Sequence, residues 1–141
     1  MLTKNSVGWL LGGGAPALFL LCLACTSIAG DCGNEVLKEI ASPGGKMKAV
    51  IFQRDCGATT GFSTQVSVLS KDEKLPDEGG NVFAADTNHG EAPSGQGGGP
   101  VVEVSWLSEN ELMIKHDTRA RALQHSQTPG GLRILYETFA K

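Results

Sequence analysis

After residue 31 the chain alternates between short apolar runs and turn residues, and no segment keeps a helical period. Short runs with period-two alternation, separated by Gly, Pro, Asn and Asp, are typical of strands in an antiparallel sheet. The pattern predicts about seven or eight short strands, at residues 34–41, 46–54, 63–70, 81–85, 101–108, 112–116, 120–126 and 132–139. We therefore expect one all-β domain over residues 34–140, built as an antiparallel sandwich, meander or small barrel.

Two of these strands differ in how much apolar surface they offer. The run Ala49–Phe52 is continuously apolar, which predicts burial on both faces of a sheet. In the run 63–70, Val66 and Val68 share one face and Ser and Thr stand between them, which predicts a half-buried strand.

The connections between the strands are of three kinds. Pro43 and Gly44 favour a hairpin turn, with Gly44 supplying a positive φ. Residues 71–80 are highly charged and predict a solvated loop. Residues 86–100 form a long Gly-rich loop, but no lysine or following helix is present to make a phosphate cradle, so we expect a flexible surface loop.

The first 24 residues differ from the rest of the chain. Lys4 is the only charged side chain before Asp31, and residues 7–24 are almost wholly apolar. This layout predicts a secretory signal peptide over residues 1–24. A retained membrane helix is the alternative, although Gly12–Gly14 and Pro16 disfavour a helix interior.

The end of the apolar run resembles a bacterial lipobox. Ala24 precedes Cys25, the residue that such a motif lipidates, but Cys22 stands where the motif usually has Leu. Ordinary cleavage after Ala29 is the alternative. We expect lipidation at Cys25, residues 25–33 as a tether, and attachment to the membrane through the N-terminal lipid.

The charge of the exported part excludes one class of partner. Without residues 1–24 the chain has 11 basic and 15 acidic side chains, a net charge of 11 − 15 = −4. Binding to nucleic acid depends on Lys and Arg neutralising phosphates, so we expect no nucleic-acid partner.

Two cysteines, Cys32 and Cys56, remain in the exported domain. An isolated pair in an oxidising compartment predicts a disulfide. The alternative is a catalytic thiol at Cys56, with His89, His116 or His125 as its base.

Two polar segments beside predicted strands are candidates for ligand binding, because binding residues commonly lie on loops held by a rigid scaffold. The side-chain oxygens of residues 86–88 suit a hard cation, but an Asx turn made by Asp86 or Asn88 explains them more simply. The candidate binding residues are Thr59, Thr60 and Ser63 in the first segment and Asp86, Asn88 and His89 in the second.

The stretch RDCGATTGFSTQVS (residues 54–67), and CGATTG within it, resembles a family of small exported bacterial proteins known only as a domain of unknown function. The resemblance covers most of residues 40–137 and implies export, with a lipid attachment site in some members. We expect a non-enzymatic binding module with no cofactor and no metal, whose partner is an envelope protein or a glycan. The alternatives are a small envelope hydrolase using Ser63 or Cys56 with a histidine, and a metal-binding envelope protein.

Overall fold

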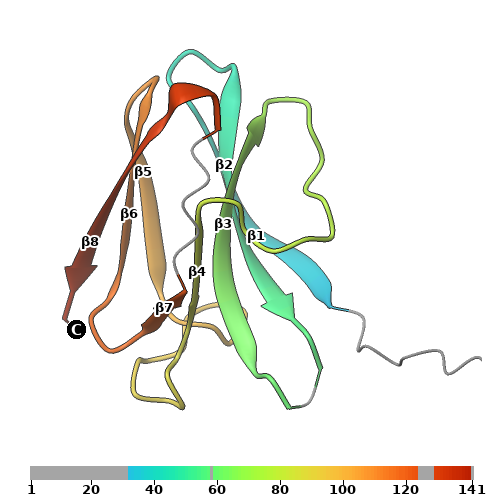
Figure 1. Cartoon of the computed structure of the whole chain (residues 1–141), viewed down its shortest axis with the longest axis vertical. Helices are drawn as coiled ribbons and strands as arrows, with labels where there is room; N and C mark the ends of the chain where they lie inside the picture. Colours follow the sequence, from blue (N-terminus) through green and yellow to red (C-terminus); the bar gives the residue numbers. More distant parts are fainter. Residues whose placement is uncertain (1–31, 58, 124–128, 141) are drawn as a thin grey trace, which may run out of the picture.

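The computed structural model describes residues 32–57, 59–123 and 129–140. These residues form eight strands in two sheets and a single 3₁₀ turn, η1 (Pro129–Gly131), with no α-helix among them (Figure 1). The predicted all-β fold is confirmed. The predicted signal peptide, the lipidation site at Cys25 and residues 25–31 of the tether lie outside the described residues.

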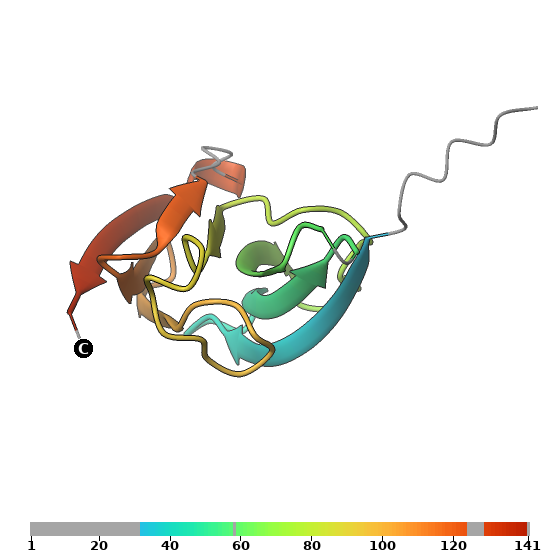
Figure 2. The same cartoon turned by 90° about the horizontal axis from the view of Figure 1, so that it is seen from below.

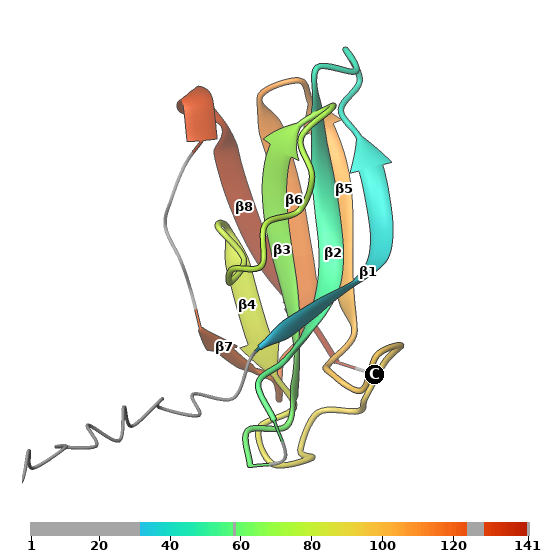
Figure 3. The same cartoon turned by 90° about the vertical axis from the view of Figure 1, so that its right-hand side faces the viewer.

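The larger sheet has five strands in the order β1-β2-β3-β4-β7, and every neighbouring pair is antiparallel. Figure 3 shows this sheet in front of the smaller one. Its strands are β1 (Gly33–Ala41), β2 (Met47–Asp55), β3 (Phe62–Ser70), β4 (Phe83–Asp86) and β7 (Arg121–Leu123).

The smaller sheet has three strands, β5 (Val102–Ser108), β6 (Glu111–Asp117) and β8 (Arg133–Phe139), in the order β5-β6-β8. β5 and β6 form an antiparallel hairpin, whereas β6 and β8 are parallel. The expectation of purely antiparallel pairing fails at this pair. After β6 the chain crosses to the other sheet to form β7, so that β8 enters the small sheet from the same end as β6.

The two sheets pack face to face and enclose the main core (Figure 2). Two aromatic side chains also join the sheets by hydrogen bonds to the main chain. Trp106 Nε1 donates to Ile40 O at 3.0 Å, and the Tyr136 hydroxyl donates to Val82 O at 2.7 Å. The buried core residues are Ala49, Ile51, Val66, Val68, Val82, Phe83, Ala85, Leu112, Ile114 and Leu132.

The large sheet is also covered on part of its outer face. Val50, Phe52 and Leu69 form a second buried cluster with Leu75, which comes from residues 71–82. This cover explains why Ala49–Phe52 is buried on both faces, as the sequence predicts. The expectation that residues 71–80 are only a solvated loop is wrong in this respect, because Leu75 closes an apolar cluster.

The hairpin turn between β1 and β2 is confirmed, but the positive φ belongs to Gly45 (67°) and not to Gly44. Gly44 serves another purpose. A Cβ at this position would lie 2.7 Å from a carboxylate oxygen of Glu109, which accepts hydrogen bonds from the Gly44 N–H and the Ser42 hydroxyl. The turn of one sheet is thus joined to the β5–β6 turn of the other.

Candidate functional site

A row of polar side chains crosses the outer face of the large sheet near one end. Directly opposed residues of an antiparallel pair share a face, and the register pairs Asn34 with Arg54, Arg54 with Ser63, Ser63 with Asp86, and Asp86 with Arg121. Arg54 follows the buried Phe52 by two residues, which places the row on the outer face. The row therefore runs over all five strands next to the buried outer cluster.

A cleft with a volume of about 580 Å³ lies at this end of the sheet, and we call it the strand-end cleft. That volume is within the range of small-molecule sites. Figure 2 views this end of the domain from below. The strand-end cleft is lined by Arg54, Cys56, Thr59, Thr60, Gly61, Phe62, Ser63, Asp86, Thr87, His89, Gly98, Arg121 and Leu123.

The strand-end cleft brings together five of the six predicted binding residues. Thr59, Thr60 and Ser63 contribute to one side, and Asp86 and His89 come from a segment more than 20 residues further along the chain. Ser63 and Asp86 are direct cross-strand partners on β3 and β4. The sixth residue, Asn88, lines an adjoining shallow hollow instead, together with His89, Arg119 and Arg121 among others.

Among the described residues that line the strand-end cleft, Asp86 is the only carboxylate, and it is held by two partners. Arg121 donates to it from Nε (3.0 Å to Oδ2) and from Nη2, and the Asn88 N–H donates to Oδ1 at 2.9 Å. Burial by itself would raise the pKa of Asp86, but the hydrogen bonds from Arg121 and Asn88 outweigh it and hold that pKa below the ordinary value. The same pair raises the pKa of Arg121, so both groups are charged at neutral pH.

The turn after β4 has an unusual backbone. The bond from the Asn88 N–H to Asp86 is the Asx turn that the sequence predicts. Asn88 and His89 then adopt positive φ values of 51° and 58°, and Gly90 follows at 90°. Positive φ is uncommon for residues with a side chain, and here it presents the His89 ring, which is exposed, at the strand-end cleft.

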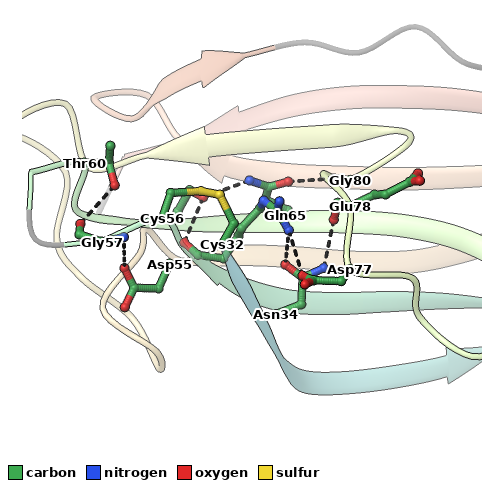
Figure 4. The surroundings of a disulfide bond; sticks show 12 residues. Cys32, Asn34, Asp55, Cys56, Gly57, Thr60, Gln65, Asp77, Glu78 and Gly80 are labelled. Carbon is green, nitrogen blue, oxygen red and sulfur yellow. Dashed lines mark hydrogen bonds and ion pairs between the residues drawn. A yellow bond between two sulfur atoms is a disulfide. The ribbon is translucent and has the colours of Figure 1, made fainter. Parts of the chain in front are cut away.

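A disulfide forms part of the wall of the strand-end cleft. Cys32 and Cys56 are bonded, as predicted, and close a loop with a sequence separation of 24. Figure 4 shows this bond between the turn that carries Thr60 and the cluster around Asn34. In that turn the Thr60 hydroxyl donates to Gly57 O at 3.1 Å, and the Gly57 N–H donates to Asp55 Oδ1 at 2.9 Å.

The candidate nucleophiles of the hydrolase alternative are engaged in other bonds. Cys56 is part of the disulfide. Ser63 Oγ donates to Arg54 O at 3.3 Å and accepts from Gln65 Nε2 at 2.9 Å. His116 is buried against Phe83, with ring centroids 5.2 Å apart, and His125 lies outside the described residues.

Several polar groups of the strand-end cleft remain available to a ligand. Within the described part of the chain, the hydroxyls of Thr59 and Thr87, the His89 ring and Nη1 of Arg121 make no hydrogen bond. Phe62 and Leu123 add apolar surface at the same place, since 45% and 49% of their surfaces are exposed. The strand-end cleft thus combines a pre-ordered ion pair with free donors and an exposed aromatic ring.

Most of the Gly-rich loop lies at the surface, as expected, but its C-terminal end packs against the sheet. Thr64 Oγ1 donates to Pro100 O at 2.8 Å, and both residues are buried. A Cβ at Gly99 would lie 2.6 Å from Thr64 N, so only glycine permits this approach. Gly98 then reaches the strand-end cleft beside Phe62.

Sequence reasoning missed the two arginines of the strand-end cleft. Arg54 lies two residues before Cys56, inside the predicted disulfide loop, and its place opposite Ser63 follows once the β2–β3 register is known. Arg121 comes from the three-residue strand β7, and its pairing with β4, 35 residues earlier, has no local signal in the sequence. Neither residue belongs to a spacing motif that reveals it from sequence.

Two further searches of the described residues bear on the class of site. They contain no group of three or more His, Cys, Asp or Glu side chains arranged to hold a metal ion. They also include no helix with the length and apolar character needed to cross a bilayer.

No protein-family model, no curated protein and no solved structure matches this chain. The resemblance to a family of small exported proteins therefore stays a prediction from the sequence, and the argument about function rests on the geometry of the strand-end cleft.

Proposed function

We propose that this protein is an exported, lipid-anchored envelope protein whose β domain is a non-enzymatic binding module, with the strand-end cleft as its ligand site. One observation carries the proposal. The segments Thr59–Ser63 and Asp86–His89, which the sequence singles out separately, line a single cleft on a rigid sheet. Polar loops positioned by a rigid scaffold are the usual form of a binding site.

The bonding of the hydroxyl and thiol groups favours binding over hydrolysis. A serine nucleophile is activated by a general base within hydrogen-bond reach, whereas the hydroxyl of Ser63 donates to a main-chain carbonyl. The sulfur of Cys56 is bonded to Cys32. These groups hold the wall of the strand-end cleft in place, which suits recognition of a ligand.

The disulfide and the N-terminal sequence together support export. Disulfides persist mainly in oxidising compartments outside the cytosol, and the apolar run ends at Ala24–Cys25. Lipidation at Cys25 attaches the domain to the membrane and leaves the strand-end cleft free for an envelope protein or a glycan. Cys25→Ala should move the protein from the membrane fraction to the soluble fraction, and identical fractionation of both proteins would contradict lipidation.

A capture experiment tests the binding function. The full chain is immobilised and exposed to solubilised envelope material from the source cells, and the bound protein and carbohydrate are measured. We expect the wild type to retain a component that the double variant Thr59→Ala/His89→Ala does not, because both side chains face the strand-end cleft and carry no internal hydrogen bond.

The matched control is Thr138→Ala, an exposed threonine of β8 that does not line the strand-end cleft. It should capture as the wild type does. Equal capture by the cleft double variant and the wild type, with unchanged folding, would show that the strand-end cleft is not the binding site.

A further inference from the structure

We infer that the strand-end cleft binds an anionic group, a carboxylate or a phosphate, carried on a saccharide. This inference rests on the proposed binding function and names the class of ligand. It starts from Asp86, the one carboxylate among the lining residues. Both oxygens of Asp86 already accept hydrogen bonds, from the Arg121 guanidinium and the Asn88 N–H. Among the described residues that line the strand-end cleft, the one carboxylate is thus already paired with a cation, which disfavours a second cation or an ammonium group there.

The groups that remain each offer a hydrogen-bond donor. A guanidinium has five N–H donors in a fixed fork, and Asp86 engages only Nε and Nη2 of Arg121. Nη1 remains, on a side chain that is 53% exposed. The hydroxyls of Thr59 and Thr87 and the ring of His89 add further donors around it. A ligand that matches this set must supply acceptor oxygens, and hydrogen bonds from a guanidinium to an anionic oxygen are stronger than those to a neutral one.

The local charge does not oppose an anion, although the domain as a whole is acidic. The lining holds two arginines, Arg54 and Arg121, and one acid, Asp86. Arg54 also pairs with Asp77 at 3.3 Å, so these four groups sum to zero. Residues 25–141 carry a net charge of 11 − 15 = −4, so the strand-end cleft is the less negative part of an acidic domain. A small bound anion therefore meets no net negative charge from these four groups.

The exposed apolar side chains indicate what carries the anionic group. Phe62 lies beside the Thr and Ser hydroxyls, and its ring is 45% exposed. An aromatic face bordered by hydroxyls and fixed polar side chains suits a sugar ring, which has an apolar face and a rim of hydroxyls. A lipid headgroup fits less well, because the acidic domain lacks the basic cluster that attracts an anionic bilayer.

Matched sugars test the inference. The ¹⁵N-labelled full chain, in detergent micelles, is titrated with glucose, glucuronate and glucose 6-phosphate, which share one ring and differ in the acidic group. We expect glucuronate or glucose 6-phosphate to shift the amide signals of Thr59–Ser63 and Asp86–His89, with an affinity at least about tenfold above that of glucose. The arms of the titration also distinguish a carboxylate from a phosphate, and inorganic phosphate reports whether the sugar ring contributes.

Variants separate recognition from folding. Arg121→Gln should remove the preference for the acidic sugars, whereas Arg133→Gln should retain it, because Arg133 forms a comparable surface ion pair with Glu111 on the small sheet. Thr59→Ala/Thr87→Ala, which breaks no internal hydrogen bond, should weaken the acidic sugar without changing the thermal midpoint.

Equal affinity for glucose and the two acids would overturn the anionic inference and leave the binding module standing. The absence of shifts with either acid would also overturn it, whereas the capture experiment decides the binding function independently. Tighter binding of inorganic phosphate than of glucose 6-phosphate would contradict the role of the sugar ring.

Discussion

The outer face of the five-stranded sheet has two halves that differ in chemistry and in cover. In the closed half, Val50, Phe52 and Leu69 are buried beneath Leu75 and the loop of residues 71–82. In the open half, the row from Asn34 to Arg121 is polar, and the strand-end cleft lies beside it. The same strands therefore support a second small core at one end and an exposed site at the other.

The boundary between the halves shows how the cover is held in place. Asn34 Nδ2 donates to Pro76 O (3.0 Å) and Glu78 O (2.8 Å), and the Gly80 N–H donates to Gln65 Oε1 at 2.6 Å (Figure 4). The loop of residues 71–82 thus covers the apolar residues of the outer face, and Asn34 of the polar row hydrogen-bonds to the edge of this loop. Beyond this edge the sheet carries charges and hydroxyls, which water or a ligand can satisfy.

The largest contrast should appear between two phenylalanines, one in each half. Phe52→Ala should lower the free energy of unfolding by about 3–5 kcal/mol, because its fully buried ring leaves a cavity. Phe62→Ala should cost less than about 1 kcal/mol, since the ring is 45% exposed. Urea unfolding of both variants checks this, and equal losses would abolish the distinction between the halves.

The disulfide links β1 to the wall of the open half, and its loss should have the next largest effect. Cys32→Ser/Cys56→Ser should destabilise the domain by about 3 kcal/mol, the chain-entropy value for a loop of 24 residues. Thermal unfolding with and without reductant measures this loss. The reduced wild type should behave as the double variant does, and reductant should leave the variant itself unchanged. If reductant did not change the thermal unfolding of the wild type, a stabilising role of the disulfide would be contradicted.

Asn81 tests the hydrogen bonds that hold the cover of the closed half. Its carboxamide accepts from Val68 N at 2.8 Å and donates to Val68 O at 2.9 Å, in place of a strand partner for β3. Asn81→Ala should cost about 1–3 kcal/mol, because it leaves these main-chain groups unpaired. Asn110→Ala, at an exposed turn position, is the matched control and should stay within about 0.5 kcal/mol of the wild type. Chemical denaturation that ranks the two variants equally would contradict this role of Asn81.

The smallest effect concerns the charge of the open half at low pH. The pKa of Asp86 is lowered from 3.8 in the folded state. Its contribution to the stability of the fold is therefore fully present above pH 3.8 and is lost as the pH falls through the folded-state pKa. Asp117, outside the strand-end cleft, has a pKa of about 2 because of hydrogen bonds from the side chain and backbone N–H of Arg119. Its contribution to the stability of the fold is lost as the pH falls from about 3.8 to about 2.

Stability measured against pH should therefore fall less steeply below 3.8 in Asp117→Asn than in the wild type, with a smaller change in Asp86→Asn. An acid limb that is identical in all three proteins would show that these ion pairs do not stabilise the fold.

The strands could be predicted from sequence because each is a short run with its own period. The alternation of Val66 and Val68 identified the inner face of β3, and the unbroken run Ala49–Phe52 indicated two buried faces. The prediction that β3 is half-buried was wrong, because Gln65, Ser67 and Leu69 on its outer face are buried as well. The parallel pair of β6 and β8 could not be predicted, because it depends on the crossing through β7. The role of Leu75 was also hidden, since one leucine in a charged loop gives no periodic signal.

The sequence singles out cleft residues where polar side chains cluster locally, and it gives no signal for those that strand register brings to the cleft. The two segments around Ser63 and Asp86 stand out as dense polar runs beside strands, and the structure places them side by side. Asn88, which has a positive φ, lines the neighbouring hollow. Arg121 was missed because its proximity to Asp86 depends on a strand pairing across 35 residues.

We propose that the open half binds a ligand, whereas the closed half is structural. The most direct measurement is the amide NMR spectrum of the ¹⁵N-labelled full chain, titrated with the carbohydrate fraction of the envelope. We expect the signals of Thr59–Ser63 and Asp86–His89 to shift together along one binding curve, while those of residues 71–82 stay fixed. Shifts confined to one of the two segments, or centred on residues 71–82, would contradict it.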